Sequence, residues 1–179
     1  MYKPLGPIVA TLALLTAGSL LADTAAKPTD PQIAHIAYTA GLIDVDAGKQ
    51  ALEKSQNADV RAFAQRMVGD HSAVNDQALA LVKKLNVTPE DNATSQSLTK
   101  QAAATREKLA GLTGPAFDKA YVDNEVAYHK TVNGALKNTL IPSAQNAELK
   151  SLLEKGLEIF EAHLQHAERL AQQLESGKS

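Results

Sequence analysis

The sequence contains no cysteine and no tryptophan, and only 4% of its 179 residues are aromatic. The lack of cysteine excludes disulfides, thiolate metal sites, a cysteine nucleophile and the lipid-bearing cysteine of a lipoprotein. Because large aromatic side chains are scarce, the core must be built from Ala, Leu, Val and Ile. That mixture suits closely packed helices better than a β-sandwich.

Basic clusters and nucleotide-binding motifs are also missing. The formal net charge is −2, and acidic and basic residues are interspersed along the chain. No basic block offers a surface for phosphates, so we expect no nucleic-acid partner. The sequence also has no glycine-rich phosphate loop and no spacing typical of a nucleophile elbow or catalytic triad.

The N-terminal residues have the pattern of a secretory signal peptide. Lys3 supplies a positive charge, residues 5–21 are uncharged, and small residues precede Asp23. We predict a signal peptide over residues 1–22, with cleavage after Ala26 as an alternative, and a periplasmic or envelope-associated protein. An uncleaved membrane anchor is a second interpretation, because the apolar stretch is near the lower length limit for a spanning helix. No segment after residue 23 is expected to span a membrane.

Residues 31–174 are expected to form one all-α domain, between a flexible leader (23–30) and a disordered tail (175–179). The periodicity of apolar residues, together with capping and helix-breaking residues, predicts helices over residues 31–55, 57–85, 95–109, 115–140 and 146–174. Asp30, Asn57 and Asn146 are the expected N-caps, and Ile141-Pro142 should end the fourth helix. Short links make two antiparallel hairpins, which the 86–114 insert joins as a crossover. The predicted fold is a ferritin-like four-helix bundle with a short extra crossover helix.

Three of the five histidines fall where core residues are expected. His71 occupies an alternate position of a heptad formed by Val60, Met67, Val74 and Leu81. His163 is central on the apolar face of the last helix, and His129 lies within that of the fourth helix. Two acids accompany these histidines: Glu125 is nearly central in the fourth helix, and Asp44 flanks the apolar stripe of the first helix.

The heights of these residues along the hairpins can also be compared. Asp44 and His71 should face each other, and so should Glu125 and His163. Imidazole and carboxylate ligands suit Zn, Fe, Cu or Mn. We therefore predict a site for one transition-metal ion, with the ligands drawn from Asp44, His71, Glu125, His129 and His163.

Two other interpretations fit the same pattern. The inward residues can form hydrogen-bonded or ionic pairs with no metal, in a purely structural or protein-interaction bundle. A metalloenzyme is a third interpretation, and it requires an open coordination position and a pocket that reaches solvent. Small residues near the site, such as Gly156 and Ala167, will either leave a cavity or permit close helix packing.

Neighbouring polar residues are weaker candidates. His166 could chelate together with His163, but its place at the edge of the apolar face favours a boundary residue. Asp70 is predicted to interact with solvent. Buried histidines should stay neutral near pH 7, so acidification is expected to charge them and loosen the bundle.

Four segments resemble the DUF4142 domain, a bacterial family of unknown function with a ferritin-like helical bundle. Asp44-Val45-Asp46-Ala47-Gly48-Lys49 is similar to the family's first motif, with Asp in place of Glu, and residues 57–71 (NADVRAFAQRMVGDH) are similar to its second. GPAFDKAYVDNEVAYHKTV and EAHLQHAERL resemble the third and closing motifs, and they contain His129 and His163. The resemblance covers roughly residues 30–174. It implies an exported, envelope-located bundle and brings no established activity.

Di-iron chemistry is not expected from this resemblance. Ferritin-like di-iron proteins use Glu-x-x-His motifs on two helices. Here Glu125 and His129 are four residues apart, and His71 has no glutamate three residues before it. We therefore expect metal binding or envelope-stress tolerance and no catalytic turnover.

Overall fold

The computed structural model describes residues 27–177, and within that range it contains helices and no strands. The predicted signal peptide (1–22) and part of the leader lie outside the described residues. The elements are α1 (Asp30–Lys54), α2 (Ala58–Lys84), α3 (Ala93–Ala110), α4 (Gly114–Ala135), the π-helix η1 (Leu136–Leu140), α5 (Ile141–Ser143) and α6 (Ala147–Glu175). The all-α prediction is confirmed, and the five main helices fall close to the predicted ranges.

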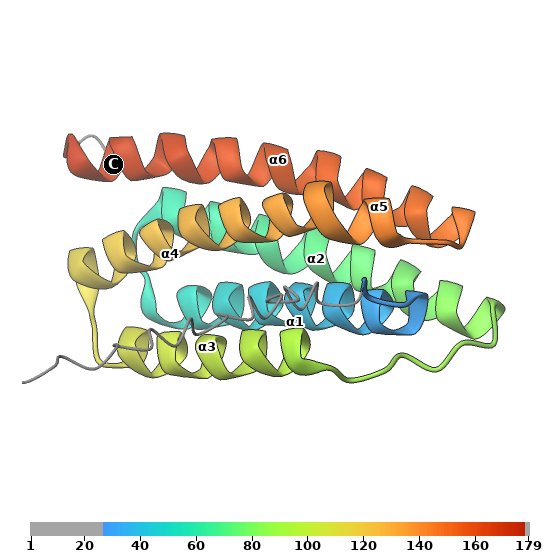
Figure 1. Cartoon of the computed structure of the whole chain (residues 1–179). Helices are drawn as coiled ribbons and strands as arrows, with labels where there is room; N and C mark the ends of the chain where they lie inside the picture. The colour runs from blue at the N-terminus through green and yellow to red at the C-terminus, as the bar shows by residue number, and fades with distance from the viewer. Residues whose placement is uncertain (1–26, 178–179) are drawn as a thin grey trace, which may run out of the picture.

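The long helices lie side by side with nearly parallel axes (Figure 1). α1 packs along α2, and α4 packs along α6, so each pair forms an antiparallel hairpin. α2 contacts α6 and α1 contacts α4, which brings the two hairpins together. α3 lies along α1, on the side away from α6 (Figure 1).

The predicted asparagine caps are confirmed, whereas the predicted Asp30 cap is wrong. The side chain of Asn57 accepts from two backbone N–H groups of α2, and that of Asn146 does the same for α6. The N-cap of α1 is Thr29, whose backbone N–H donates to the side chain of Gln32. The Asp30 carboxylate instead accepts from the backbone N–H groups of residues 145 and 146, each 2.8 Å away. It therefore ties the start of α1 to the start of α6.

The prediction that Ile141-Pro142 ends the fourth helix is also wrong. The helical path continues as η1 and then as α5 up to Ser143. The backbone N–H of Ile141 donates to the carbonyl of Leu136, five residues back. This wider turn shifts the carbonyls that the ring of Pro142 would otherwise meet in an α-helix, so the helix can extend past the proline.

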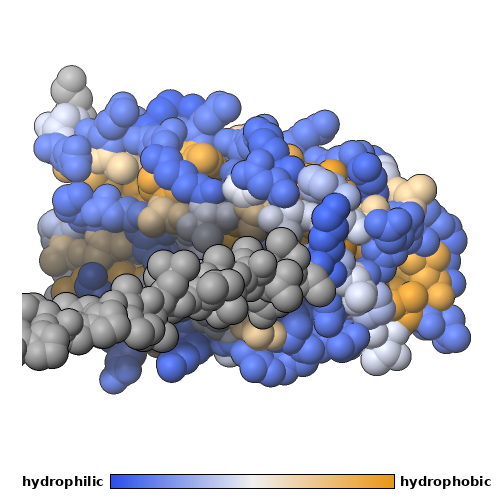
Figure 2. All heavy atoms as spheres, in the orientation of Figure 1, coloured by the Kyte–Doolittle hydropathy of each residue, from blue (hydrophilic) through white to orange (hydrophobic). Residues whose placement is uncertain are grey.

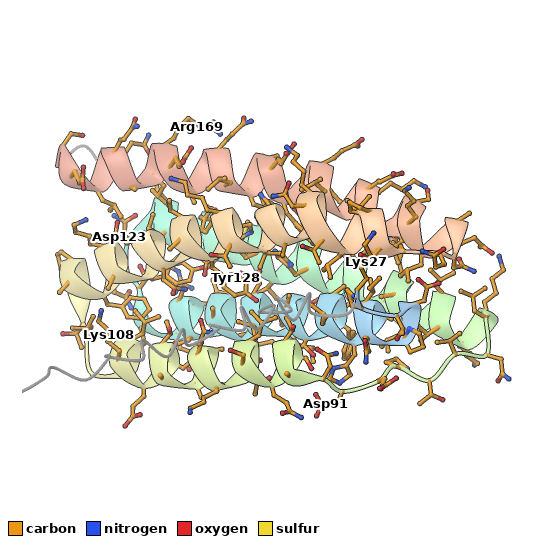
Figure 3. The ribbon with its side chains drawn as sticks, viewed as in Figure 1. Lys27, Asp91, Lys108, Asp123, Tyr128 and Arg169 are labelled. Carbon is orange, nitrogen blue, oxygen red and sulfur yellow. The ribbon has the colours of Figure 1, made fainter. Side chains whose placement is uncertain are left out.

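The core consists of two apolar clusters that fill different parts of the bundle. One includes Phe63, Met67 and Tyr121, and the other includes Ile33, Leu136 and Phe160. Hydrophilic side chains cover most of the face seen in Figure 2, with hydrophobic patches between them. Charged residues such as Lys108, Asp123 and Arg169 are exposed (Figure 3).

None of the helices in residues 27–177 is both long and apolar enough to cross a membrane.

Candidate metal centre

All five residues predicted as metal ligands are buried inside the bundle, with 1–2% of each residue exposed. α1 provides Asp44, α2 provides His71, α4 provides Glu125 and His129, and α6 provides His163. On each helix, the polar position lies in the sequence between residues of the two apolar clusters. The site is therefore a polar layer across the middle of an aliphatic bundle.

The three imidazole rings form a compact triangle. The ring centroids of His71, His129 and His163 are 5.3–5.6 Å apart. One nitrogen from each ring lies within 4.8 Å of the other two. A second group with the same limit contains Asp44, Glu125 and His129, so His129 belongs to both groups. The sequence could not show whether the two hairpins share a level, and the structure brings both sets of residues together.

The predicted opposition of Asp44 and His71 is confirmed. Nε2 of His71 lies 3.3 Å from Oδ2 of Asp44. The structure groups Glu125 with Asp44 and His129, while His163 joins the other two imidazoles. On α4, one helical turn separates Glu125 from His129, and Nδ1 of His129 is 3.6 Å from Oε2 of Glu125.

The hydrogen bond of His129 determines which of its nitrogens faces the site. Nδ1 lies 3.0 Å from the backbone carbonyl of Glu125, which can only accept a hydrogen bond. Nδ1 must therefore carry the proton, and in the neutral ring Nε2 keeps its lone pair. Nε2 is buried and has no hydrogen-bond partner. His129 thus presents a lone pair that could ligate a cation.

His163 is oriented in the same manner by Asp70. Nε2 of His163 lies 2.8 Å from Oδ2 of Asp70, so the ring donates to this carboxylate. Nδ1 then keeps its lone pair, and it too is buried and unpartnered. The prediction that Asp70 interacts with solvent was incomplete: its side chain is 44% exposed but hydrogen-bonds to a buried histidine of the facing helix. A carboxylate behind a histidine is the usual outer support of a metal-ligating imidazole.

Several other polar atoms of the site lack hydrogen-bond partners. They are Oδ1 of Asp44, both ring nitrogens of His71 and both carboxyl oxygens of Glu125. Native proteins leave few buried polar atoms unpaired, because each costs free energy. In this structure the unpaired donors and acceptors come from four helices and gather at one place. The donor set of imidazole nitrogens and carboxyl oxygens therefore fits a transition-metal ion.

Burial keeps the imidazoles neutral. It lowers the pKa of His71 well below 6.5, and the neighbouring His129 and His163 lower it further. Burial also lowers the pKa of His129 to about 4. The pKa of His163 is lowered by burial, although the hydrogen bond with Asp70 partly opposes this shift. Neutral imidazoles have the lone pairs that a metal requires.

The two carboxyl groups are shifted in the opposite direction. Burial raises the pKa of Glu125 to about 7, and the neighbouring Asp44 carboxyl group partly opposes the rise. Burial and the nearby charge of Glu125 raise the pKa of Asp44 well above 3.8. Without a cation, both groups therefore hold their protons to a higher pH than ordinary carboxyl groups do. A divalent ion would favour ionisation of both.

Two tyrosines of α4, Tyr121 and Tyr128, lie beside the carboxyl groups. The hydroxyl of Tyr128 donates to the backbone carbonyl of Ala40 at 3.1 Å, and this links α4 to α1 (Figure 3). The hydroxyl of Tyr121 is buried and unpartnered. Burial and the nearby Glu125 and Asp44 raise the pKa of Tyr121 well above 10. Both tyrosines therefore remain neutral.

The remaining histidines do not join the site. His166 is half-buried, and its ring packs edge-on against Phe63, 5.1 Å away between centroids. This agrees with its prediction as a boundary residue. Among residues 27–177, neither candidate group contains His35 or His166.

The family model for the domain of unknown function DUF4142 matches residues 15–170 of the chain. The chain belongs to the DUF4142 family. The suspected resemblance is therefore confirmed, and the matched region contains all five candidate ligands together with Asp70. No curated protein and no solved structure matches the chain.

Proposed function

We propose that this DUF4142 protein is an exported, non-catalytic binding protein for one transition-metal ion, of Zn, Fe, Cu or Mn. The ligands are drawn from three histidines and two acids: Asp44, His71, Glu125, His129 and His163. The fold is a ferritin-like four-helix bundle in which α3 is the crossover helix. The pairing of α1 with α2 and of α4 with α6 supports this assignment.

The observation that carries the proposal is the set of buried, unpartnered donor atoms. Nε2 of His129 and Nδ1 of His163 have lone pairs because their other nitrogens donate to oxygen atoms. One nitrogen from each of the three rings lies within 4.8 Å of the other two, which is close to the span of at most about 4.2 Å that two Zn–N bonds of about 2.1 Å allow.

The number of protein ligands supports a binding role without turnover. Three imidazoles and two carboxylates can fill the coordination sphere of a first-row ion without water. Sites closed in this way are typical of structural metals, whereas catalytic sites keep one position open. The proposed role is metal binding or tolerance of envelope stress, in the periplasm or attached to the envelope.

Elemental analysis tests the metal proposal directly. Untagged protein purified from the periplasm without chelators should contain one transition-metal ion per chain. His71→Leu and His163→Leu should each lose the ion while circular dichroism shows an intact helical fold. His166→Leu is the matched control, because His166 is on the same helix as His163 but outside the cluster, and it should keep the full metal content.

A second function is favoured by a specific observation. His163 hydrogen-bonds to Asp70, and Nε2 of His71 lies 3.3 Å from the Asp44 carboxyl group, so contacts within the protein alone partly satisfy the polar layer. In this structural or protein-interaction bundle, no metal is needed. A melting temperature that does not change with a chelator or with added Zn, Cu or Fe, in protein free of metal, would select this function.

A further inference from the structure

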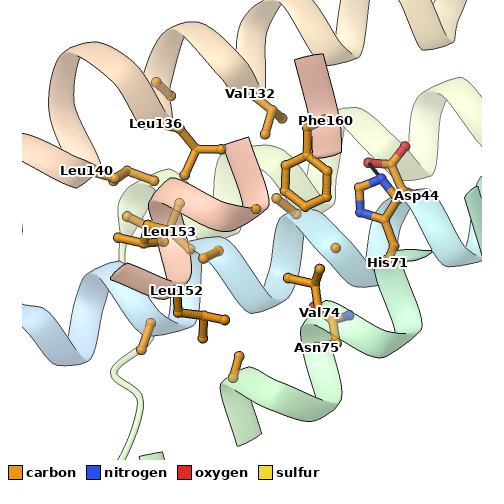
Figure 4. Close-up of a pocket in the computed structure, with 18 of the residues that line it drawn as sticks. Asp44, His71, Val74, Asn75, Val132, Leu136, Leu140, Leu152, Leu153 and Phe160 are labelled. Atoms are coloured by element: carbon orange, nitrogen blue, oxygen red, sulfur yellow. Dashed lines mark ion pairs between the residues drawn. The ribbon is translucent and has the colours of Figure 1, made fainter. Parts of the chain in front are cut away.

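A cavity of about 160 Å³ adjoins the candidate metal centre on one side. α1, α2, η1 and α6 supply most of its wall (Figure 4). Leu136, Leu140 and Leu153 line one part, whereas Asp44 and His71 lie at the other end (Figure 4). The ring of Phe160 also lines the cavity and stacks on the ring of His71, with 4.4 Å between centroids.

Gly156 on α6 contributes to the open volume. A Cβ atom built on Gly156 would meet Phe160 at 3.4 Å and Val74 at 4.0 Å, which are ordinary contacts. Close helix packing therefore does not require glycine at this position. By contrast, a Cβ on Gly48 would lie 2.8 Å from Val68 and 3.0 Å from the backbone carbonyl of Ala64. Glycine inside a helix is less favourable than alanine, so glycine at position 156 keeps the cavity open at the expense of helix stability.

Of the two small residues considered from the sequence, only one borders this space. Gly156 lines the cavity, and Ala167 is fully buried in the packed apolar core. The π-helix η1 supplies both Leu136 and Leu140 to the wall. Single π turns in helices occur frequently at functional sites.

The lining determines which molecule fits. Nearly all of the cavity surface is aliphatic or aromatic carbon, so water would find few hydrogen-bond partners there. A cavity of about 150 Å³ with similar lining, engineered into another protein, stays dry and binds benzene or xenon. Two residues on the rim, Thr94 and Thr131, are exposed at the protein surface. A ligand could therefore enter between α3 and α4.

We propose that this cavity is a binding site for a small, uncharged, hydrocarbon-like molecule about the size of a benzene ring. A bound molecule would contact Phe160 and the leucines of η1, next to the Asp44–His71 pair. An anion is disfavoured, because the wall contains no lysine or arginine and the Asp44 carboxyl group lies at one end. The proposal does not depend on a metal, since the apolar lining alone provides the binding surface.

Binding of benzene and benzoate to the full chain tests the proposal, measured by ligand-observed NMR titration with and without a chelator. Benzene should bind at least tenfold more tightly than benzoate, and its affinity should stay within twofold when the chelator is added. Gly156→Leu places a side chain in the cavity and should weaken benzene binding at least tenfold. Gly69→Leu is the matched control: Gly69 is an exposed helical glycine with no atom within 4 Å of its Cβ position.

Intermolecular NOEs between benzene and the methyl groups of Leu136, Leu140 and Leu153 provide a second measurement on the unmodified protein. They keep the test decisive if Gly156→Leu does not fold. The proposal is overturned if benzene fails to bind, if NOEs arise only from other residues, or if a folded Gly156→Leu protein binds as well as the control. Failure to find a metal would leave these results unaffected.

Discussion

The carboxylate of Asp70 on α2 accepts a hydrogen bond from Nε2 of His163 on α6, over 2.8 Å. The next residue on α2, His71, faces Asp44 of α1. Two consecutive residues of α2 therefore have different roles in the same polar layer. One is a candidate ligand, and the other fixes the proton position of a second ligand.

Replacing Asp70 should weaken metal binding without removing a ligand. In Asp70→Ala, the ring of His163 loses the partner that fixes its orientation and tautomer, so zinc affinity should fall about 10- to 100-fold. A competition titration with a chromophoric chelator measures this change. Asp76→Ala, at an exposed position of the same helix, should bind zinc as the unmodified protein does. Equal affinities for both variants would show that Asp70 does not position His163.

Metal binding should release protons and become tighter as the pH rises. Glu125, whose pKa is raised to about 7 by burial, is largely protonated at pH 6 and must lose its proton to act as a ligand. Calorimetric titration with zinc in buffers of different ionisation enthalpy counts the released protons. We expect more protons released at pH 6 than at pH 8, and none released at either pH would contradict a carboxylate ligand.

The pH dependence of stability in metal-free protein combines two opposing effects. The buried histidines have lowered pKa values. Their contribution to the free energy of unfolding is therefore complete above pH 6.5 and is lost as the pH falls, for His129 down to about pH 4. Glu125 has a raised pKa, so its contribution is complete below pH 4.5 and is lost as the pH rises through about 7. The expectation that acid loosens the bundle considered only the histidines. The buried carboxyl groups act in the opposite direction, because their protonation on acidification stabilises the folded protein.

Glu125→Gln should separate these two effects. Between pH 6.5 and 4.5, acidification should destabilise the unmodified protein through the buried histidines and stabilise it through the buried carboxyl groups. The variant lacks the stabilising contribution of Glu125. On acidification over this interval it should therefore lose about 3 kcal/mol more free energy of unfolding than the unmodified protein. Urea unfolding of chelator-treated protein at several pH values measures the difference. Parallel curves for the two proteins would show that Glu125 titrates normally.

Gly48 and Gly69 should respond differently to alanine. Gly48→Ala forces a methyl group toward the side chain of Val68 and the backbone of Ala64, so we expect a loss of about 1–3 kcal/mol. Gly69→Ala meets no atom within 4 Å and should gain up to about 1 kcal/mol from helix propensity. Chemical denaturation measures both, and stabilisation by Gly48→Ala would show that α1 and α2 can separate without cost.

Helical periodicity was sufficient to predict that the five candidate ligands are buried, because four of them lie within an apolar face and Asp44 flanks one. It also predicted the Asp44–His71 contact, since both residues lie at similar distances from one short link. The role of Asp70 could not be predicted in this way, because its partner is on a helix that is remote in the sequence. The π turn at η1 escaped prediction too, because Pro142 is compatible both with a helix end and with a wider turn, and the spacing does not distinguish the two.

The distribution of the candidate ligands has a consequence for a chain that has no cysteine. An ion bound to residues 44, 71, 129 and 163 would join all four long helices of the two hairpins at one point. Like a covalent cross-link, it would connect helices that are remote in the sequence. Because the unfolded chain would release the ion, its binding free energy would add to the stability of the folded bundle. Unlike a disulfide, this cross-link would be independent of the redox environment, and acid or a competing chelator could open it.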